Sequence, residues 1–117
     1  MNQQSKSPID LEQLNQISEG GIEFEIEVLQ AYAEDIHQRI DLVSEAIANN
    51  DHGQIMRATH HIKGSSSNVG AWQMQALAIQ MENLEQSQNL ANTSEIIDNM
   101  IKEIQSIEQF IIERSKS

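Results

Sequence analysis

The stretch IEFEIEVLQAYAEDIHQRIDLVSEAI, residues 22–47, decides the fold class of this chain. Its apolar residues recur at intervals of three and four rather than two, which is the period of an α-helix and not of a strand. A helix with one continuous apolar stripe has to bury that stripe against other elements. The stripe is about seven turns long and consists of Ile22, Ile26, Leu29, Tyr32, Ile36, Ile40, Val43 and Ile47.

Three later segments repeat the same period. One helix is expected at about 52–68, another begins after Gly70, and the last follows the polar stretch EQSQNLANTS, where Asn92 or Thr93 can provide the N-cap. The spacing of the last stripe alternates between three and four, which is typical of helices packed at a shallow angle. The last two stripes are Met74, Leu77, Met81 and Leu84, and then Ile97, Met100, Ile104, Ile107 and Ile111.

The N-terminal residues predict one more helix, a short one. Ser7 is a suitable N-cap, Pro8 suits the first helical position, and Asp10 places an acid in the first turn. The pair Gly20 and Gly21 is expected to end this helix. Four long amphipathic helices with short connections therefore predict an all-α fold, an antiparallel four-helix bundle with a short N-terminal capping helix.

Composition excludes several classes of partner. The 18 acidic and 7 basic residues give a net charge of -11, which would repel nucleic acid and anionic membrane surfaces. No apolar stretch approaches the roughly 20 residues needed to span a bilayer, and the lack of cysteine rules out disulfides and thiolate metal sites. We expect a cytoplasmic monomer with one domain, residues 1–117, and an ordered core at about 8–114.

The third helical segment presents a histidine to solvent. Its core face consists of Ile55, Thr59, Ile62, Ser66 and Val69, and at about 100° per residue His60 lies about 160° from the centre of that face. One or two turns away along the helix, the same side of it carries Met56, Arg57, Lys63, Gly64 and Ser67.

The residues around His60 are poor choices for helix stability alone. A glycine such as Gly64 costs a helix about 1 kcal/mol relative to alanine, and the neighbouring serines cost a fraction of that. Because side chains lean toward the helix N-terminus, the glycine leaves the imidazole open to a large partner. Residues 52–81 contain no Asp or Glu but include Arg57 and Lys63, which predicts a locally positive histidine suited to accept a phosphoryl group. An imidazole is a competent nucleophile near neutral pH.

The segment ATHHIKGSSSNVGA, residues 58–71, resembles the active-site segment of histidine phosphotransfer (HPt) domains. The family pattern is a histidine, two residues, Lys-Gly-Ser-Ser, and a glycine ten residues after the histidine. The resemblance implies a four-helix bundle with His60 as the phosphorylated nucleophile, Lys63 stabilising the phosphoryl charge and Gly64 admitting the partner. The matching positions are His60, Lys63, Gly64, Ser65, Ser66 and Gly70.

The resemblance also implies relay chemistry. A receiver domain would donate a phosphoryl group from its aspartate to His60, which would pass it to another receiver, in a pathway that starts from a hybrid histidine kinase. Such a carrier has no kinase activity and binds no cofactor of its own, and the Mg²⁺ ion is expected on the receiver. The partner-binding residues would be Met56, Arg57, Gly64 and Ser67, while Ser65, Ser66 and Gly70 belong to the structural part of the motif.

The sequence departs from the family at a second position that can contact the phosphoryl group. Many relatives carry glutamine at a position equivalent to Trp72 or to Glu82 in this chain. Gln73 or Gln75 is an alternative hydrogen-bond donor. The neighbouring His61 is expected to lie at the boundary of the core rather than beside His60.

Two other functions are alternatives to the phosphorelay. One is a metal-binding bundle, for which Glu34 and His37 form a Glu-x-x-His pair, but a di-iron site needs a second pair and the sequence has none. We therefore expect no metal site. The other is a helical module that docks partners without transferring phosphate, which the intact His60, Lys63 and Gly64 disfavour.

Overall fold

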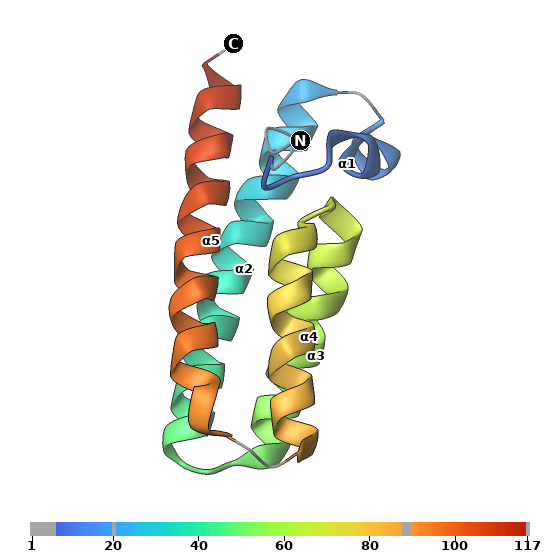
Figure 1. The fold of residues 1–117 in the computed structure, drawn as a ribbon. Helices are drawn as coiled ribbons and strands as arrows, with labels where there is room; N and C mark the ends of the chain where they lie inside the picture. Colours follow the sequence, from blue (N-terminus) through green and yellow to red (C-terminus); the bar gives the residue numbers. More distant parts are fainter. Residues whose placement is uncertain (1–6, 20, 88–89, 117) are drawn as a thin grey trace, which may run out of the picture.

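The computed structural model describes residues 7–19, 21–87 and 90–116, and within these ranges the chain is a helical bundle without strands (Figure 1). Gly20, which was predicted to help end the first helix, and the chain ends at 1–6 and 117 lie outside these ranges. The elements are α1 (Leu11–Ser18), α2 (Ile22–Ala48), α3 (His52–Val69), α4 (Trp72–Ser87), the short 3-10 helix η2 (Leu90–Asn92) and α5 (Thr93–Ser115).

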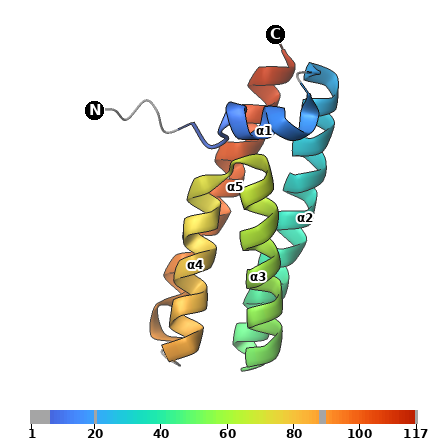
Figure 2. The same ribbon diagram turned by 90° about the vertical axis from the view of Figure 1, so that its right-hand side faces the viewer.

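The four long helices run alternately up and down, which confirms the predicted antiparallel four-helix bundle (Figure 1). Each packs beside its neighbour in the chain, and α5 closes the bundle by packing beside α2. The short helix α1 crosses the end of the α3–α4 hairpin (Figure 2). No helix in the described ranges is long and apolar enough to cross a membrane.

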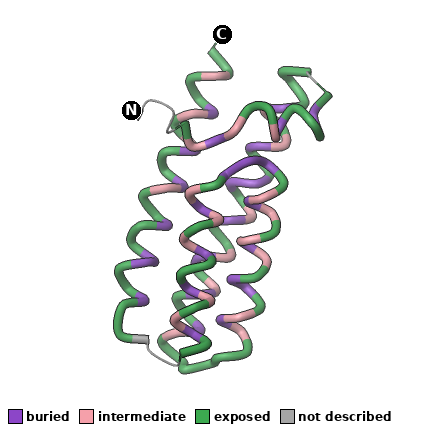
Figure 3. Tube along the Cα trace, turned by 45° about the vertical axis from the view of Figure 1, so that its right-hand side comes forward, coloured by how far each residue is buried: buried purple, intermediate pink, exposed green. Residues whose placement is uncertain are grey.

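Most residues of the predicted stripes lie in the core of the bundle, and buried positions recur along each helix at the helical period (Figure 3). On α4 the prediction is only half right, because Leu77 and Leu84 are partly buried and the inner positions between Met74 and the end of the helix also include Ala78 and Glu85. All five residues of the α5 stripe are buried, from Ile97 to Ile111. On α2 the stripe is buried in its middle, whereas Ile22 remains 44% exposed. The first turn of α2 extends past the α3–α4 hairpin, so that this end of the stripe has fewer helices to cover it (Figure 1).

The start of the first helix differs from the prediction. Its N-cap is Asp10 and not Ser7, and the Asp10 carboxylate accepts hydrogen bonds from the backbone N–H groups of Glu12 (3.1 Å) and Gln13 (3.4 Å). Ile9 is buried, and the Asp10 N–H donates to the carbonyl of Gly70 at 2.9 Å. The chain before Leu11 is therefore held across the end of the hairpin by core packing and cannot begin a helix at Pro8.

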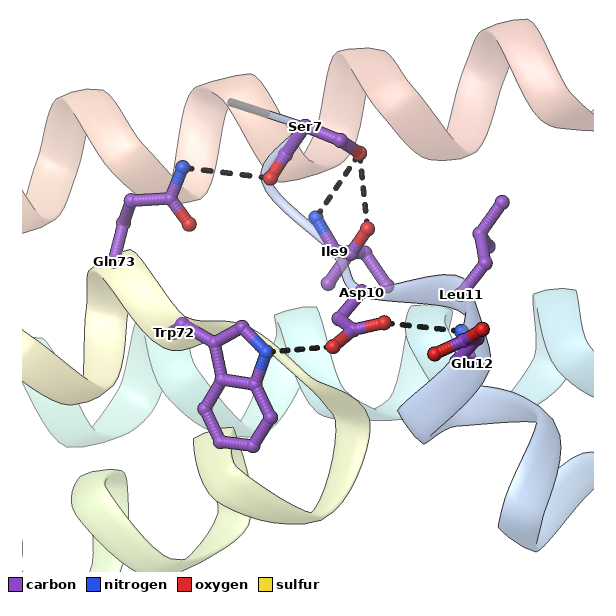
Figure 4. Close-up of a pocket in the computed structure, with 7 residues that line it drawn as sticks. All are labelled: Ser7, Ile9, Asp10, Leu11, Glu12, Trp72 and Gln73. Atoms are coloured by element: carbon purple, nitrogen blue, oxygen red, sulfur yellow. Dashed lines mark hydrogen bonds between the residues drawn. The ribbon is translucent and has the colours of Figure 1, made fainter. Parts of the chain in front are cut away.

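Gly70 allows the N-terminal segment to approach the α3–α4 turn. It ends α3 in the left-handed conformation with φ 76°, and the next residue, Ala71, donates to the carbonyl of Ser66 at 2.8 Å. Beside this turn the indole N–H of Trp72 donates to the Asp10 carboxylate at 2.9 Å (Figure 4). This hydrogen bond lowers the pKa of Asp10 and fastens the N-terminal segment to the bundle.

A buried hydrogen bond joins α2 to the helix that carries the motif. The hydroxyl groups of Tyr32 and Ser66 lie 2.6 Å apart, Ser66 is fully buried, and burial raises the pKa of Tyr32. The serine of the family motif therefore contributes to packing between helices rather than to the exposed site.

Replacing Tyr32 with phenylalanine is expected to lower the free energy of unfolding by about 1–2 kcal/mol, because Ser66 would lose its partner while remaining buried. Urea denaturation of the variant measures the change. The double variant Tyr32→Phe, Ser66→Ala removes both polar groups and should recover part of the lost stability. Equal stability of Tyr32→Phe and the wild type would contradict this role of the hydrogen bond.

Candidate functional site

The structure confirms the predicted orientation of α3. All five core-face residues, from Ile55 to Val69, are buried. His60 points away from them and exposes 75% of its side chain. Two polar members of the core face are accommodated differently, since Ser66 has Tyr32 as a partner while the Thr59 hydroxyl has no hydrogen-bond partner in the described part of the chain.

The side chains around His60 leave it accessible. We call this surface the His60 face; it consists of His60 with Met56, Arg57, Lys63, Gly64 and Ser67. Gly64 is exposed, and a Cβ atom built there would meet no atom within 4 Å, so the space above this turn is open. Arg57 is exposed and Met56 is half-buried, which leaves both available to a partner.

A carboxylate from the neighbouring helix enters this face. Glu82 on α4 places Oε1 3.0 Å from Nζ of Lys63 and Oε2 3.6 Å from Nδ1 of His60. The expectation of a positive site without a nearby carboxylate is therefore wrong. The stretch without Asp or Glu ends at Met81, and the next residue is Glu82. Because α4 packs beside α3, Glu82 lies close to His60 in the folded chain.

The position of Glu82 distinguishes the two nitrogens of the imidazole. A separation of 3.6 Å is longer than a hydrogen bond, so the interaction with His60 is electrostatic. The negative charge lies on the Nδ1 side and favours the tautomer with its proton on that nitrogen. Nε2 then carries the lone pair, which is the arrangement a nucleophilic imidazole needs.

His61 lies at the boundary of the core, as predicted, and faces α2. Its Nε2 atom is 2.6 Å from the carboxylate of Asp35, whose other oxygen lies 3.4 Å from the Arg39 guanidinium. This pairing could not be predicted from local spacing, because Asp35 is 26 positions away in the sequence. The two adjacent histidines therefore use carboxylates from opposite neighbours, Asp35 on α2 for His61 and Glu82 on α4 for His60.

The other two histidines form separate pairs. His37 on α2 lies 2.7 Å from Glu108 on α5, and His52 contacts the buried carboxylate of Glu85 on α4. In the ranges that the structure describes, no three side chains of His, Cys, Asp or Glu come together in a group that could hold a metal ion. The Glu34 and His37 pair therefore gains no further ligand within these ranges.

Two residues that could have supplied the second contact to the phosphoryl group, Trp72 and Gln73, face the N-terminal segment instead. Trp72 donates to Asp10, and the amide nitrogen of Gln73 donates to the carbonyl of Ser7 at 3.4 Å (Figure 4). Both side chains hold the N-terminal segment. Glu82 is the residue that reaches the histidine, and a role for Gln75 stays a prediction.

Comparisons with known proteins identify the family of the chain and similar folds. A family model described as the Hpt domain matches residues 27–110, which include all of α3 and α4. The histidine-containing phosphotransfer protein B (HptB) from Pseudomonas aeruginosa PAO1 has a similar structure, with a TM-score of 0.84 at 20% identity over 96% of this chain and 98% of that one. The HPT domain of a sensor hybrid histidine kinase from Shewanella has a TM-score of 0.71 at 15% identity, over 92% of each chain. No curated protein sequence matches the chain.

Proposed function

Because this chain belongs to the Hpt domain family, whose members carry phosphoryl groups in phosphorelays, we propose that His60 is the residue that receives and passes on the phosphoryl group. The observation that carries this proposal is the exposure of 75% of the His60 side chain, on a helix face that Gly64 keeps open. A receiver domain can therefore bring its aspartyl phosphate to the imidazole without displacing any side chain at position 64.

The proposed transfer uses the lone pair of Nε2. This nitrogen attacks the phosphorus atom of the receiver's aspartyl phosphate, a P–N bond forms, and the P–O bond breaks with its electron pair left on the aspartate carboxylate. The proton on Nδ1 is released to solvent, so the ring of the phosphorylated histidine is neutral and the charge that it gains is that of the phosphoryl group. The reverse reaction with a second receiver passes the phosphoryl group on. Transfer of this kind requires in-line positioning and charge neutralisation, and needs no nucleotide at this site.

The residues of the His60 face have separate roles in this proposal. Lys63 would turn from Glu82 toward the phosphoryl oxygens and neutralise part of their charge. Met56, Arg57 and Ser67 would contact the receiver. The receiver holds the Mg²⁺ ion, and the chain acts as a cytoplasmic monomer without kinase activity, between a hybrid histidine kinase and its response regulators.

Phosphorylation tests the proposal directly. Incubation with a phosphorylated receiver domain is expected to place on the chain a phosphate that resists base and is lost in acid, which is the behaviour of a phosphohistidine. A base-labile phosphate, as on an aspartate, or none at all with any of a panel of receivers, would overturn it.

Replacing Gly64 with glutamine is expected to slow phosphoryl transfer by about tenfold or more, because a long side chain at this position would keep the receiver from the imidazole. Stopped-flow or quench measurements of transfer from a phosphorylated receiver provide the rate, and circular dichroism checks that helicity is retained. Gly64→Ala is the matched control, since a methyl group fits the open space. An unchanged rate in Gly64→Gln would contradict the role of the glycine.

A further inference from the structure

Glu82 enters the His60 face from α4 and brings a negative charge to the place where a phosphoryl group would arrive. Its side chain is only 13% exposed, and both of its oxygens are directed at residues of the site, Lys63 and His60. The other cation of the face, Arg57, donates to the side chain of Gln54 at 3.0 Å and has no ion pair in the described structure. A largely covered carboxylate thus neutralises the cation that would otherwise meet the incoming phosphoryl group.

The charge on His60 changes when it is phosphorylated, and the charge on Glu82 does not. A phosphoryl group carries up to about two negative charges near neutral pH. It would compete with Glu82 for the ammonium group of Lys63, and the carboxylate would repel it from the adjacent side of the ring. Because Glu82 is largely shielded from water, this repulsion is screened less than it would be between exposed charges.

We propose that Glu82 destabilises phosphorylated His60 relative to the phosphorylated receiver, so that the site passes its phosphoryl group on readily and does not store it. This inference rests on the proposed role of His60. In the unphosphorylated state Glu82 is a positioning residue, because it pairs with Lys63 at 3.0 Å and faces the Nδ1 edge of the imidazole at 3.6 Å. In the phosphorylated state the same carboxylate acts through Lys63 and His60 to shift the transfer equilibrium toward the receiver.

The variant Glu82→Gln tests the inference, because glutamine has a similar size and can still contact Lys63 but carries no charge. The probe is a receiver domain that has been phosphorylated with acetyl phosphate and that transfers to the wild type. At equilibrium, the ratio of phosphorylated chain to phosphorylated receiver is expected to rise about tenfold, or about 1.4 kcal/mol. The Michaelis constant for the receiver should stay close to the wild-type value, because Glu82 is largely covered.

Further variants separate the charge of Glu82 from its structural role. Glu82→Asp keeps the charge and is expected to keep most of the bias toward the receiver. Asp35→Asn is the matched control, because it removes one charge from the partner of the neighbouring His61 and leaves His60 untouched. Its equilibrium should stay near that of the wild type. In Lys63→Gln the gain from Glu82→Gln should be smaller, since competition for the ammonium group is gone.

The two proposals fail in different ways. If the wild type accepts phosphate but Glu82→Gln reaches the same equilibrium or a lower one, the charge bias is refuted and the role of His60 stands. The bias is refuted as well if Glu82→Asp behaves like Glu82→Gln, because then the shape of the side chain matters and not its charge. If the wild type takes up no phosphate, it is the proposed function that fails.

Discussion

Replacing His60 with glutamine is expected to abolish phosphoryl acceptance. The glutamine amide has no basic nitrogen lone pair and cannot form the P–N bond, although it is polar and fits a helix surface. The fold should survive, because the His60 side chain is 75% exposed and only approaches Glu82, at 3.6 Å, in the described structure. Phosphorus NMR or labelled phosphate, measured after incubation with a phosphorylated receiver, should show incorporation in the wild type and none in the variant.

The adjacent histidine provides the matched control for this experiment. His61→Gln removes the same chemical group one position along the helix, where it pairs with Asp35 on the side of α2. This variant should still accept phosphate at close to the wild-type level. The site is wrongly placed if His60→Gln is labelled as well as the wild type, or if His61→Gln is the variant that loses the label.

Replacing Gly70 with alanine is expected to have the largest effect on stability, a loss of about 2–4 kcal/mol in the free energy of unfolding. The φ angle of 76° is strained for alanine, and a Cβ atom would lie 2.7 Å from the carbonyl oxygen of Asp10 and 2.8 Å from its Cβ. The N-terminal segment would have to move, which would weaken the hydrogen bond from Asp10 N–H to Gly70. Urea or thermal denaturation measures this loss.

Gly64→Ala is the control for the stability experiment. Gly64 lies inside α3 with ordinary helical geometry and open space around it, so alanine there should raise the free energy of unfolding by up to about 1 kcal/mol. The two glycines of one helical motif should thus respond in opposite directions. Similar destabilisation at both positions would mean that the close approach of Asp10 does not explain the need for glycine at position 70.

The sequence predicted the helices because each of them buries a periodic stripe, and periodicity depends only on local spacing. The core face of α3, from Ile55 to Val69, and the opposite orientation of His60 follow from the same arithmetic and are confirmed. The start of α1 could not be predicted in this way. Ser7 and Asp10 are both good N-caps, and the choice between them depends on Ile9 reaching the core and on contact with Gly70, which is 60 residues later.

The candidate site could likewise be predicted only in part, because relations within one helix are visible in the sequence and contacts between helices are not. His60 and the open position at Gly64 lie on one helix, so their relation was visible in the sequence. The partners of the two histidines were not, because Asp35 and Glu82 come from neighbouring helices whose register is set by packing of the whole core. Glu82 lies one residue beyond the acid-free stretch 52–81, so a count of charges within that stretch does not include it. Its position is nevertheless one at which many relatives carry glutamine, and this difference from the family is visible in the sequence.

The helix that carries His60 is held by α2 on one side, by α4 on another, and by α1 across its end (Figure 2). A surface held in this way is preorganised, so little conformational entropy of its backbone would be lost when a receiver docks. The free-energy cost of adapting the interface then falls mainly on the long side chains of the His60 face, such as Met56, Arg57 and Lys63. If His60 relays a phosphoryl group as proposed, a rigid backbone with a few adaptable side chains would let the same surface dock different receivers in succession without refolding.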